Sequence, residues 1–175
     1  MTIVALAGLP DPLDMVLWGA LATAAMTGIM QGAQGLGLSR LSLPFLVGTM
    51  FSANRRRATL VGFIVYALGG WLFAFLYFLL LARLHLLCWW AGGLLGLLHG
   101  LLLLVAALPL FPLVHPRLAS DFDAPVARPL LEPPGFLALN YGHATPLTML
   151  LAQAVYGTLI GGLPQLAAAF LPNAG

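Results

Sequence analysis

The sequence contains no lysine and few charged residues of any kind. Its 175 residues are 61% hydrophobic and only 7% charged, with a mean hydropathy of +1.00. A soluble domain usually carries about 25% charged residues, so this chain lacks the polar surface that water would require. The formal net charge of only +2 gives no reason to expect a nucleic-acid partner. We therefore expect an integral membrane protein.

Cysteine is nearly absent, and recognisable catalytic motifs are absent altogether. The single Cys88 can form neither a disulfide within the chain nor a zinc-type pair, and we interpret it as a small apolar residue at a span end. No nucleophile elbow, phosphate-binding loop or zinc-protease motif occurs. The predicted spans also lack Asp, Glu and Lys, which ion-coupled transporters usually carry inside the membrane. The sequence thus predicts no enzyme, no metal site and no resident cofactor.

What the sequence does contain is four hydrophobic segments, each long enough to cross a bilayer, which takes about 20 residues. We expect an all-α fold with four transmembrane helices in a single domain. The predicted spans are residues 15–36, 59–82, 88–112 and 146–170. A shorter apolar piece at 43–51 predicts an interfacial helix, with a re-entrant segment as the alternative. Residues 1–9 are interpreted as an interfacial leader, and residues 115–141 as a proline-rich polar loop.

Small residues recur at helical spacing in the first and fourth spans. Gly28 and Gly32 are four residues apart, and so are Gly157 and Gly161. Such pairs let helix backbones approach closely in membranes. We expect both pairs to pack against other helices, within this chain or in a partner.

The arginines are unevenly distributed between the predicted loops. Four lie between spans one and two, and two lie between spans three and four: Arg40, Arg55, Arg56, Arg57, Arg117 and Arg128. Only Arg83 lies in the connection on the other side. Cytoplasmic loops carry the excess of basic residues. We therefore predict both long loops in the cytoplasm, with the first four arginines near lipid phosphates, and both termini outside.

His99 lies near the middle of span three, where an ionisable side chain usually has a role. The polar residues expected within reach are Gln31, Gln153, Tyr66 and Tyr156. We interpret His99 as a neutral side chain bonded to another helix. A proton or substrate path and an axial ligand for haem or chlorin are the alternatives. A two-histidine haem within the chain is excluded, because His115 is roughly 24 Å further along a helix.

A second polar group is predicted at the cytoplasmic interface, where the loop leaves span three and enters span four. It comprises His115, Arg117, Asn140, Tyr141 and His143. We expect a structural tie, with Arg117 binding phosphate or a carbonyl at a helix end. The alternative is a metal site between the histidines, completed by loop carboxylates: Asp121, Asp123 and Glu132.

Several short sequences in the second half resemble those of a group of small four-span bacterial inner-membrane proteins of unknown function. They are Leu97-Leu98-His99-Gly100, Pro109-x-x-Pro112, His115-Pro116-Arg117, Pro134-Gly135-Phe136, Asn140-Tyr141-Gly142 and Gln153-x-x-Tyr156-Gly157. The resemblance covers about half of the chain and implies the four-span fold but no activity. That group is expected to have a histidine where this chain has Gln153, so a paired-histidine site is not implied here.

Three functions remain open from the sequence. The favoured one is a non-catalytic accessory or structural subunit of a larger membrane complex, with lipids and other subunits, or further copies of itself, as partners. A small homo-oligomeric transporter or channel using His99, Gln31 and Gln153 is the alternative. Pigment or haem binding through His99 is the third.

Overall fold

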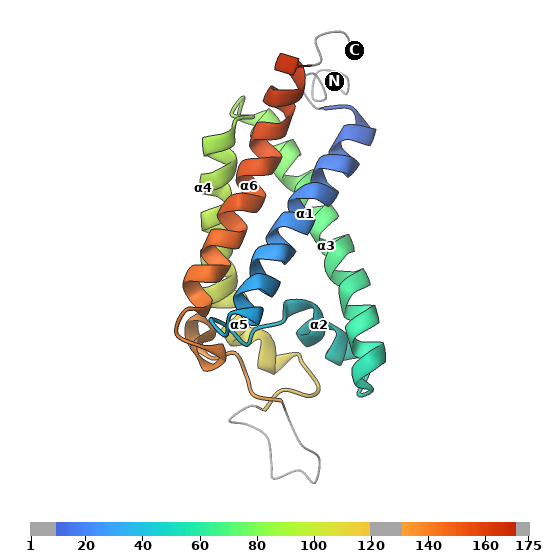
Figure 1. The fold of residues 1–175 in the computed structure, drawn as a ribbon, viewed down its shortest axis with the longest axis vertical. Helices are drawn as coiled ribbons and strands as arrows, with labels where there is room; N and C mark the ends of the chain where they lie inside the picture. The colour runs from blue at the N-terminus through green and yellow to red at the C-terminus, as the bar shows by residue number, and fades with distance from the viewer. Residues whose placement is uncertain (1–9, 120–130, 171–175) are drawn as a thin grey trace. The chain divides into compact units, whose positions relative to one another are not determined.

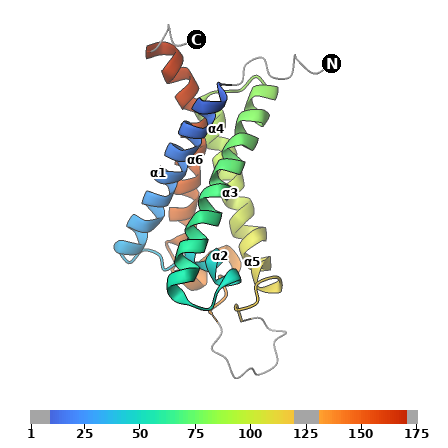
Figure 2. The same cartoon turned by 90° about the vertical axis from the view of Figure 1, so that its right-hand side faces the viewer.

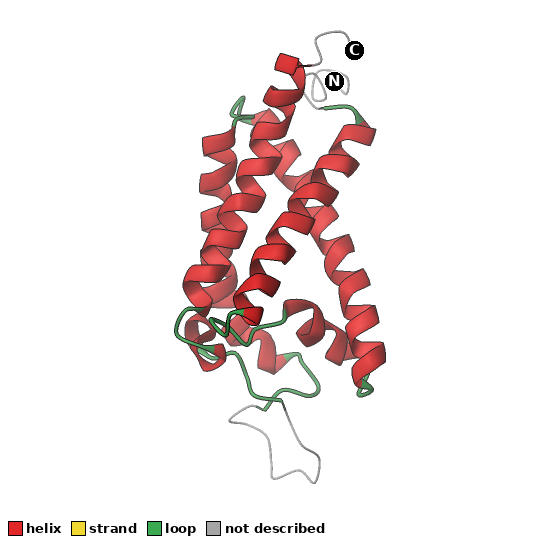
Figure 3. Cartoon of the chain, viewed as in Figure 1, coloured by secondary structure: helices red, strands yellow, loops and turns green. Residues whose placement is uncertain are grey.

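The computed structural model describes residues 10–119 and 131–170, and within these ranges the chain is helical apart from its connections and one isolated β-bridge (Figures 1 and 3). Four helices are long and apolar enough to cross a membrane. They are α1 (Pro12–Gly35), α3 (Arg55–Arg83), the composite helix Trp89–Leu113, and Thr145–Leu166 within α6 (Thr145–Phe170). The predicted all-α fold with four candidate spans is confirmed.

Three of the four spanning helices begin slightly before the predicted spans, and at α3 a side-chain cap extends the helix. α3 starts at Arg55, four residues early, since the Asn54 side chain accepts a hydrogen bond from the Arg57 amide at 3.1 Å. Asn is a favoured residue for this N-terminal position. α6 starts at Thr145, one residue before the predicted start at Pro146. The hydrophobic runs therefore located the spans, and the polar cap at Asn54 sets the start of α3.

The third span changes its helical type where two prolines occur. Regular helix α4 (Trp89–Leu102) passes into a π-helix, η2 (Leu103–Ala107), then α5 (Leu108–Leu110) and a 3₁₀ turn, η3 (Phe111–Leu113). Pro109 has no N–H, and its ring clashes with the carbonyl four residues earlier in a regular helix. The wider π turn, closed by the Leu108 amide on the Leu103 carbonyl, relieves this conflict. The third span thus ends at Leu113 through a change of helix type at its two prolines.

The short helix α2 (Leu43–Phe51) has the bounds that were expected for the piece between the first two spans. Ser42 caps its start by accepting a hydrogen bond from the Phe45 amide at 3.4 Å. The packing of α2 on α3 depends on glycine, because a Cβ on Gly48 would overlap the Ala58 carbonyl and one on Gly62 would overlap the Pro44 carbonyl. This hairpin therefore brings two backbones into direct contact.

The chain divides into two compact units, which we describe separately. Within the described ranges, the first unit comprises residues 10–28, 67–99 and 150–170, and the second comprises residues 29–66, 100–119 and 131–149. In the first unit, α4 and α6 pack through glycines, because a Cβ on Gly92, Gly96 or Gly157 would overlap backbone of the facing helix. In the second unit, α2 lies beside the start of α3 (Figure 2).

Candidate functional site

The intramembrane histidine is held by an aromatic cluster in the first unit. The Tyr77 hydroxyl lies 3.0 Å from His99 Nδ1 and donates a hydrogen bond to the Leu95 carbonyl at 3.3 Å. The Phe73 ring packs on the imidazole with a centroid separation of 4.4 Å. Tyr156 meets Tyr77 edge-on at 5.5 Å. His99 is thus half-buried between α3 and α4, with its Nδ1 edge occupied.

The polar partners expected for His99 lie elsewhere. The Tyr156 hydroxyl donates to the Gly70 carbonyl at 2.6 Å. Gln153 is buried, and its Oε1 has no hydrogen-bond partner within residues 10–119 and 131–170. Gln31 belongs to the second unit and has an exposed side chain. None of the three is a hydrogen-bond partner that the structure gives to His99.

Sequence reasoning missed Tyr77 as the partner of His99, although a signal for it existed. Helices α3 and α4 form a hairpin around Leu86, and residues equidistant from such a turn lie at the same level. Tyr77 and Leu95 are each nine positions from Leu86, and they are hydrogen-bonded. Side chains four apart share a helix face, which extends the contact from Leu95 to His99.

A second cluster, in the second unit, joins the exit of the third span to α2. His115 is buried, and its Nδ1 accepts a hydrogen bond from the Arg117 amide at 3.1 Å. Its Nε2 therefore carries the proton and faces the Leu46 carbonyl at 3.0 Å and Thr49 Oγ1 at 3.2 Å. Burial lowers the pKa of His115, since the charged form is poorly solvated there; the nearby Arg117 charge lowers it further, and the bond to Leu46 partly offsets this.

Arg117 caps the end of α2. Its Nη1 donates to the Thr49 carbonyl and also to the Met50 carbonyl, at 3.2 Å for the latter. The last carbonyls of a helix have no partner within the helix, and a cation there also meets the negative end of the helix dipole. This arrangement supports the predicted structural tie through a carbonyl at a helix end.

The other members of the predicted interface cluster bind a different part of the loop. Asn140 Nδ2 donates to the Pro133 carbonyl at 2.9 Å, and the Tyr141 hydroxyl donates to the Glu132 carbonyl at 2.7 Å. Burial, with the Glu132 charge adding to it, raises the pKa of Tyr141 to about 12, against the opposing effect of Arg40. Arg40 contacts both parts of this loop: its guanidinium donates a hydrogen bond to the Asn140 carbonyl at 2.6 Å and lies 3.5 Å from the Glu132 carboxylate.

No metal-binding group emerges from the described part of this cluster. His143 is exposed and makes no side-chain hydrogen bond within the described residues, while both nitrogens of His115 are already used. The described residues contain no group of three or more His, Cys, Asp and Glu that could hold a metal ion. Asp121 and Asp123, which the metal alternative required, lie outside the described residues.

The predicted packing glycines have two different environments. Gly157 and Gly161 on α6 face the backbone of α4, at Gly92 and Cys88. A Cβ on Gly28 or on Gly32 of α1 would meet nothing within 4 Å, and both glycines are exposed. The Gly-x-x-x-Gly face of α6 is thus packed against backbone of the same chain, whereas the corresponding face of α1 has no neighbour within 4 Å.

The arginines at the start of α3 are exposed. Arg55, Arg56 and Arg57 are exposed, and the side chains of all three lack a hydrogen bond within the described residues. Arg55 lies over the Phe45 ring at 6.0 Å from its centroid. Three exposed guanidinium groups without a hydrogen bond in the described chain, at the end of a spanning helix, suit contact with lipid phosphates.

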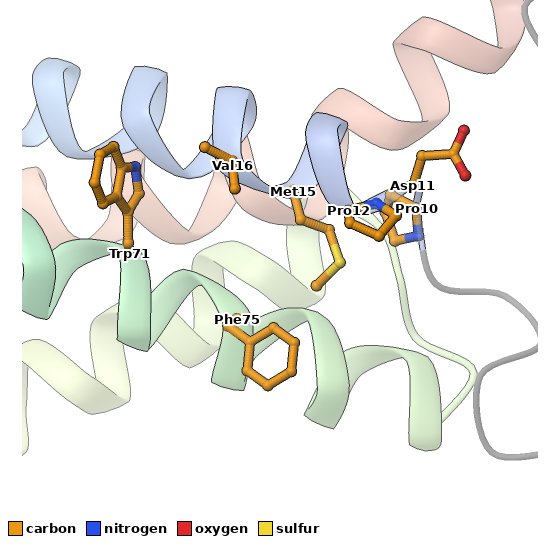
Figure 4. A pocket seen from close by; sticks show the side chains of 7 residues that line it. All are labelled: Pro10, Asp11, Pro12, Met15, Val16, Trp71 and Phe75. Atoms are coloured by element: carbon orange, nitrogen blue, oxygen red, sulfur yellow. The ribbon is translucent and has the colours of Figure 1, made fainter. Parts of the chain in front are cut away.

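An open pocket of about 470 Å³ lies in the first unit, where the start of α1 meets α3 (Figure 4). The side chains of Trp71, Phe75 and Met15 form its apolar wall, and among the described lining residues Asp11 alone is charged. The remaining lining residues are Pro10, Pro12 and Val16. The pocket contains none of the site residues predicted from the sequence, and a single rim carboxylate gives it no acid–base pair.

Comparisons with known proteins found no match: no family model, no curated protein and no solved structure matches the chain. The resemblance to four-span bacterial membrane proteins therefore stays a prediction. The function has to be argued from the two clusters and from the faces of the helices.

Proposed function

We propose that this chain is a non-catalytic accessory or structural subunit of a larger membrane complex. The observation that carries the proposal is the open small-residue face of α1, where Cβ atoms on Gly28, Gly32 and Gly35 would each meet nothing within 4 Å. In membranes, helices associate mainly by close packing at such residues. On α6 the equivalent face is already filled by α4. The α1 face, with three such glycines, is therefore available to a helix of another subunit.

A polar residue on the same face supports this role. Gln31 lies between Gly28 and Gly35 at heptad-like spacing, is exposed, and makes no hydrogen bond within the described residues. An amide facing hydrocarbon without a partner is costly. A helix from a partner subunit that packs on the glycines brings polar groups within reach of Gln31 and removes that cost.

The cluster at the loop also fits a supporting role better than a chemical one. The side chains of His115 and Arg117 donate hydrogen bonds to carbonyls of α2. Those of Asn140 and Tyr141 donate to the carbonyls of Pro133 and Glu132 in the loop. These contacts hold the loop surface in place and use all four side chains for hydrogen bonds within the described chain. We infer that this surface faces the cytoplasm of a bacterium, with the chain in the inner membrane, because the free arginines Arg55–Arg57 lie at the same end of α3.

Purification in mild detergent from native membranes tests the proposal. We expect the wild type to copurify with at least one other membrane protein in constant proportion, and the double variant Gly28→Ile/Gly32→Ile to lose it. The double variant should still fold, since both side chains enter open space. The matched control is Gly69→Ile on α3, whose position is also open but lies on another helix. A protein that purifies alone, or a double variant that keeps the partner, would contradict the proposal.

A further inference from the structure

The first turn of α3 carries three positive charges that are not balanced within the described residues. The side chains of Arg55–Arg57 are exposed and make no ion pair or hydrogen bond there. The described part of the second unit contains one acidic residue, Glu132, whose carboxylate lies 3.5 Å from Arg40. Cations are also unfavourable in the first turn of a helix, where the helix dipole is positive. An anion from outside the chain would therefore stabilise this turn.

The apolar side chains next to these arginines indicate that the anion belongs to a lipid. Arg56, Leu60 and Ile64 follow one another at intervals of four residues on α3, so they share one face of the helix. Leu60 is 60% exposed and Ile64 is 61% exposed. When a helix of this kind crosses a bilayer, its first turn lies near the headgroups. A lipid with a phosphate at Arg56 covers Leu60 and Ile64 with an acyl chain, whereas a soluble anion leaves both uncovered.

The three guanidinium groups form two separate cationic positions. Arg55 lies over the Phe45 ring of α2, with 6.0 Å from its Cζ to the ring centroid. Successive residues of an α-helix are about 100° apart around its axis, so Arg56 and Arg57 leave α3 in other directions, toward the face of Leu60. An arginine binds a phosphate best through two parallel hydrogen bonds, which fixes the phosphate close to that side chain. A headgroup with one phosphate therefore reaches only one of the two positions well.

We propose that the start of α3, together with Phe45 of α2, binds an anionic phospholipid whose headgroup contains two phosphates, as that of cardiolipin does. One phosphate binds Arg55 beside α2, and the other binds Arg56 and Arg57 above the exposed apolar face. Basic sites next to spanning helices bind headgroups of this type. Charge complementarity supports this occupant, since two negative charges meet a turn with three positive ones. The site goes beyond the proposed subunit role and does not depend on it.

Native mass spectrometry of the purified full-length chain in mild detergent tests the site, because it counts the lipids bound to each molecule. We expect one cardiolipin per chain to bind at least about 5-fold more tightly than phosphatidylglycerol at equal phosphate concentration, and phosphatidylcholine to bind most weakly. Arg55→Gln and Arg56→Gln should each weaken cardiolipin binding by about 5-fold. The matched control is Arg83→Gln, which removes the same charge from an exposed position at the other end of α3 and should leave binding unchanged.

The lipids and the variants together decide the outcome. Weaker binding in Arg55→Gln and Arg56→Gln, with full binding in Arg83→Gln, supports the site. An equal loss in Arg83→Gln would reduce the effect to net charge and overturn the proposal, as would equal binding of cardiolipin and phosphatidylglycerol. Excess inorganic diphosphate should not displace the lipid; displacement would assign the arginines to a soluble anion instead. The substituted positions are exposed, so the variants should melt like the wild type. The readout needs no partner subunit, so its result is separate from that of the copurification experiment.

Discussion

At the scale of single residues, the two histidines that the sequence singled out have different surroundings. His99 contacts Tyr77 through Nδ1 in an aromatic cluster, whereas both nitrogens of His115 are bonded to protein. The reason is local: the backbone turns back after His115 and presents the Arg117 amide to Nδ1. The sequence identified both residues as polar sites, but their chemistry was decided by neighbours as distant as Leu46.

His115 should make the stability of the protein depend on pH. Its pKa in the folded protein is below the usual value of 6.5, so the unfolded chain binds the proton more readily. Stability should be fully present above pH 6.5 and fall as the pH drops through the folded pKa. Protonation of Nδ1 also removes the acceptor of the Arg117 amide. Thermal melting above and well below pH 6.5 measures this dependence.

The control for this effect is His115→Gln, which keeps a donor but does not titrate. We expect the variant to be less stable than the wild type at neutral pH and to lose less stability on acidification. Equal pH dependence in the two proteins would assign the effect to other groups.

At the scale of helices, close packing is concentrated at glycines with a backbone opposite them. A Cβ on Gly157 would overlap the Gly92 carbonyl, and one on Gly62 would overlap the Pro44 carbonyl. The Gly-x-x-x-Gly spacing is the same at Gly28, where nothing is opposite. The motif thus predicts the capacity for close approach, and the rest of the fold determines whether that capacity is used within the chain.

Substitution of glycine by alanine should reduce stability on the packed face of α6 but not on the open face of α1. Gly157→Ala should lower stability by about 1 to 3 kcal/mol or more, because the methyl group overpacks a rigid backbone contact. Gly28→Ala should change it by less than about 0.5 kcal/mol, as for an exposed position. Thermal unfolding in detergent compares the two. Similar losses in both variants would show that Gly28 is also packed within the chain.

At the scale of the whole molecule, the connections between spans one and two and between spans three and four lie together in the second unit. The Ser39 and Thr145 hydroxyls are 2.8 Å apart, and Arg40 reaches the Asn140 carbonyl. The sequence predicts these two loops on one side of the membrane, and the excess of arginines predicts that this side is the cytoplasm. Their direct contacts depend on residues about 100 positions apart, which no local pattern specifies.

The single cysteine offers a test of the proposed orientation. Cys88 is partly exposed and lies in the short turn before α4, on the side that we propose faces away from the cytoplasm. A membrane-impermeant maleimide added to intact cells should label it. In a Cys88→Ser background, Leu139→Cys, at a loop position 41% exposed, should be labelled only after the membrane is permeabilised. The reverse labelling pattern would invert the orientation.

The sequence by itself determined the four spans, the short helix before the second span and the end of the third span near its two prolines. These features depend on hydrophobic length, capping residues and missing amide hydrogens, all of which act within a few residues. Only the tertiary structure decided which glycines are filled, that Tyr77 holds His99, and that Arg117 caps α2. The contacts of Tyr77 and Arg117 join residues 22 and 68 positions apart. A side chain's partner across such a separation is set by how the helices pack, not by its own neighbours in the chain.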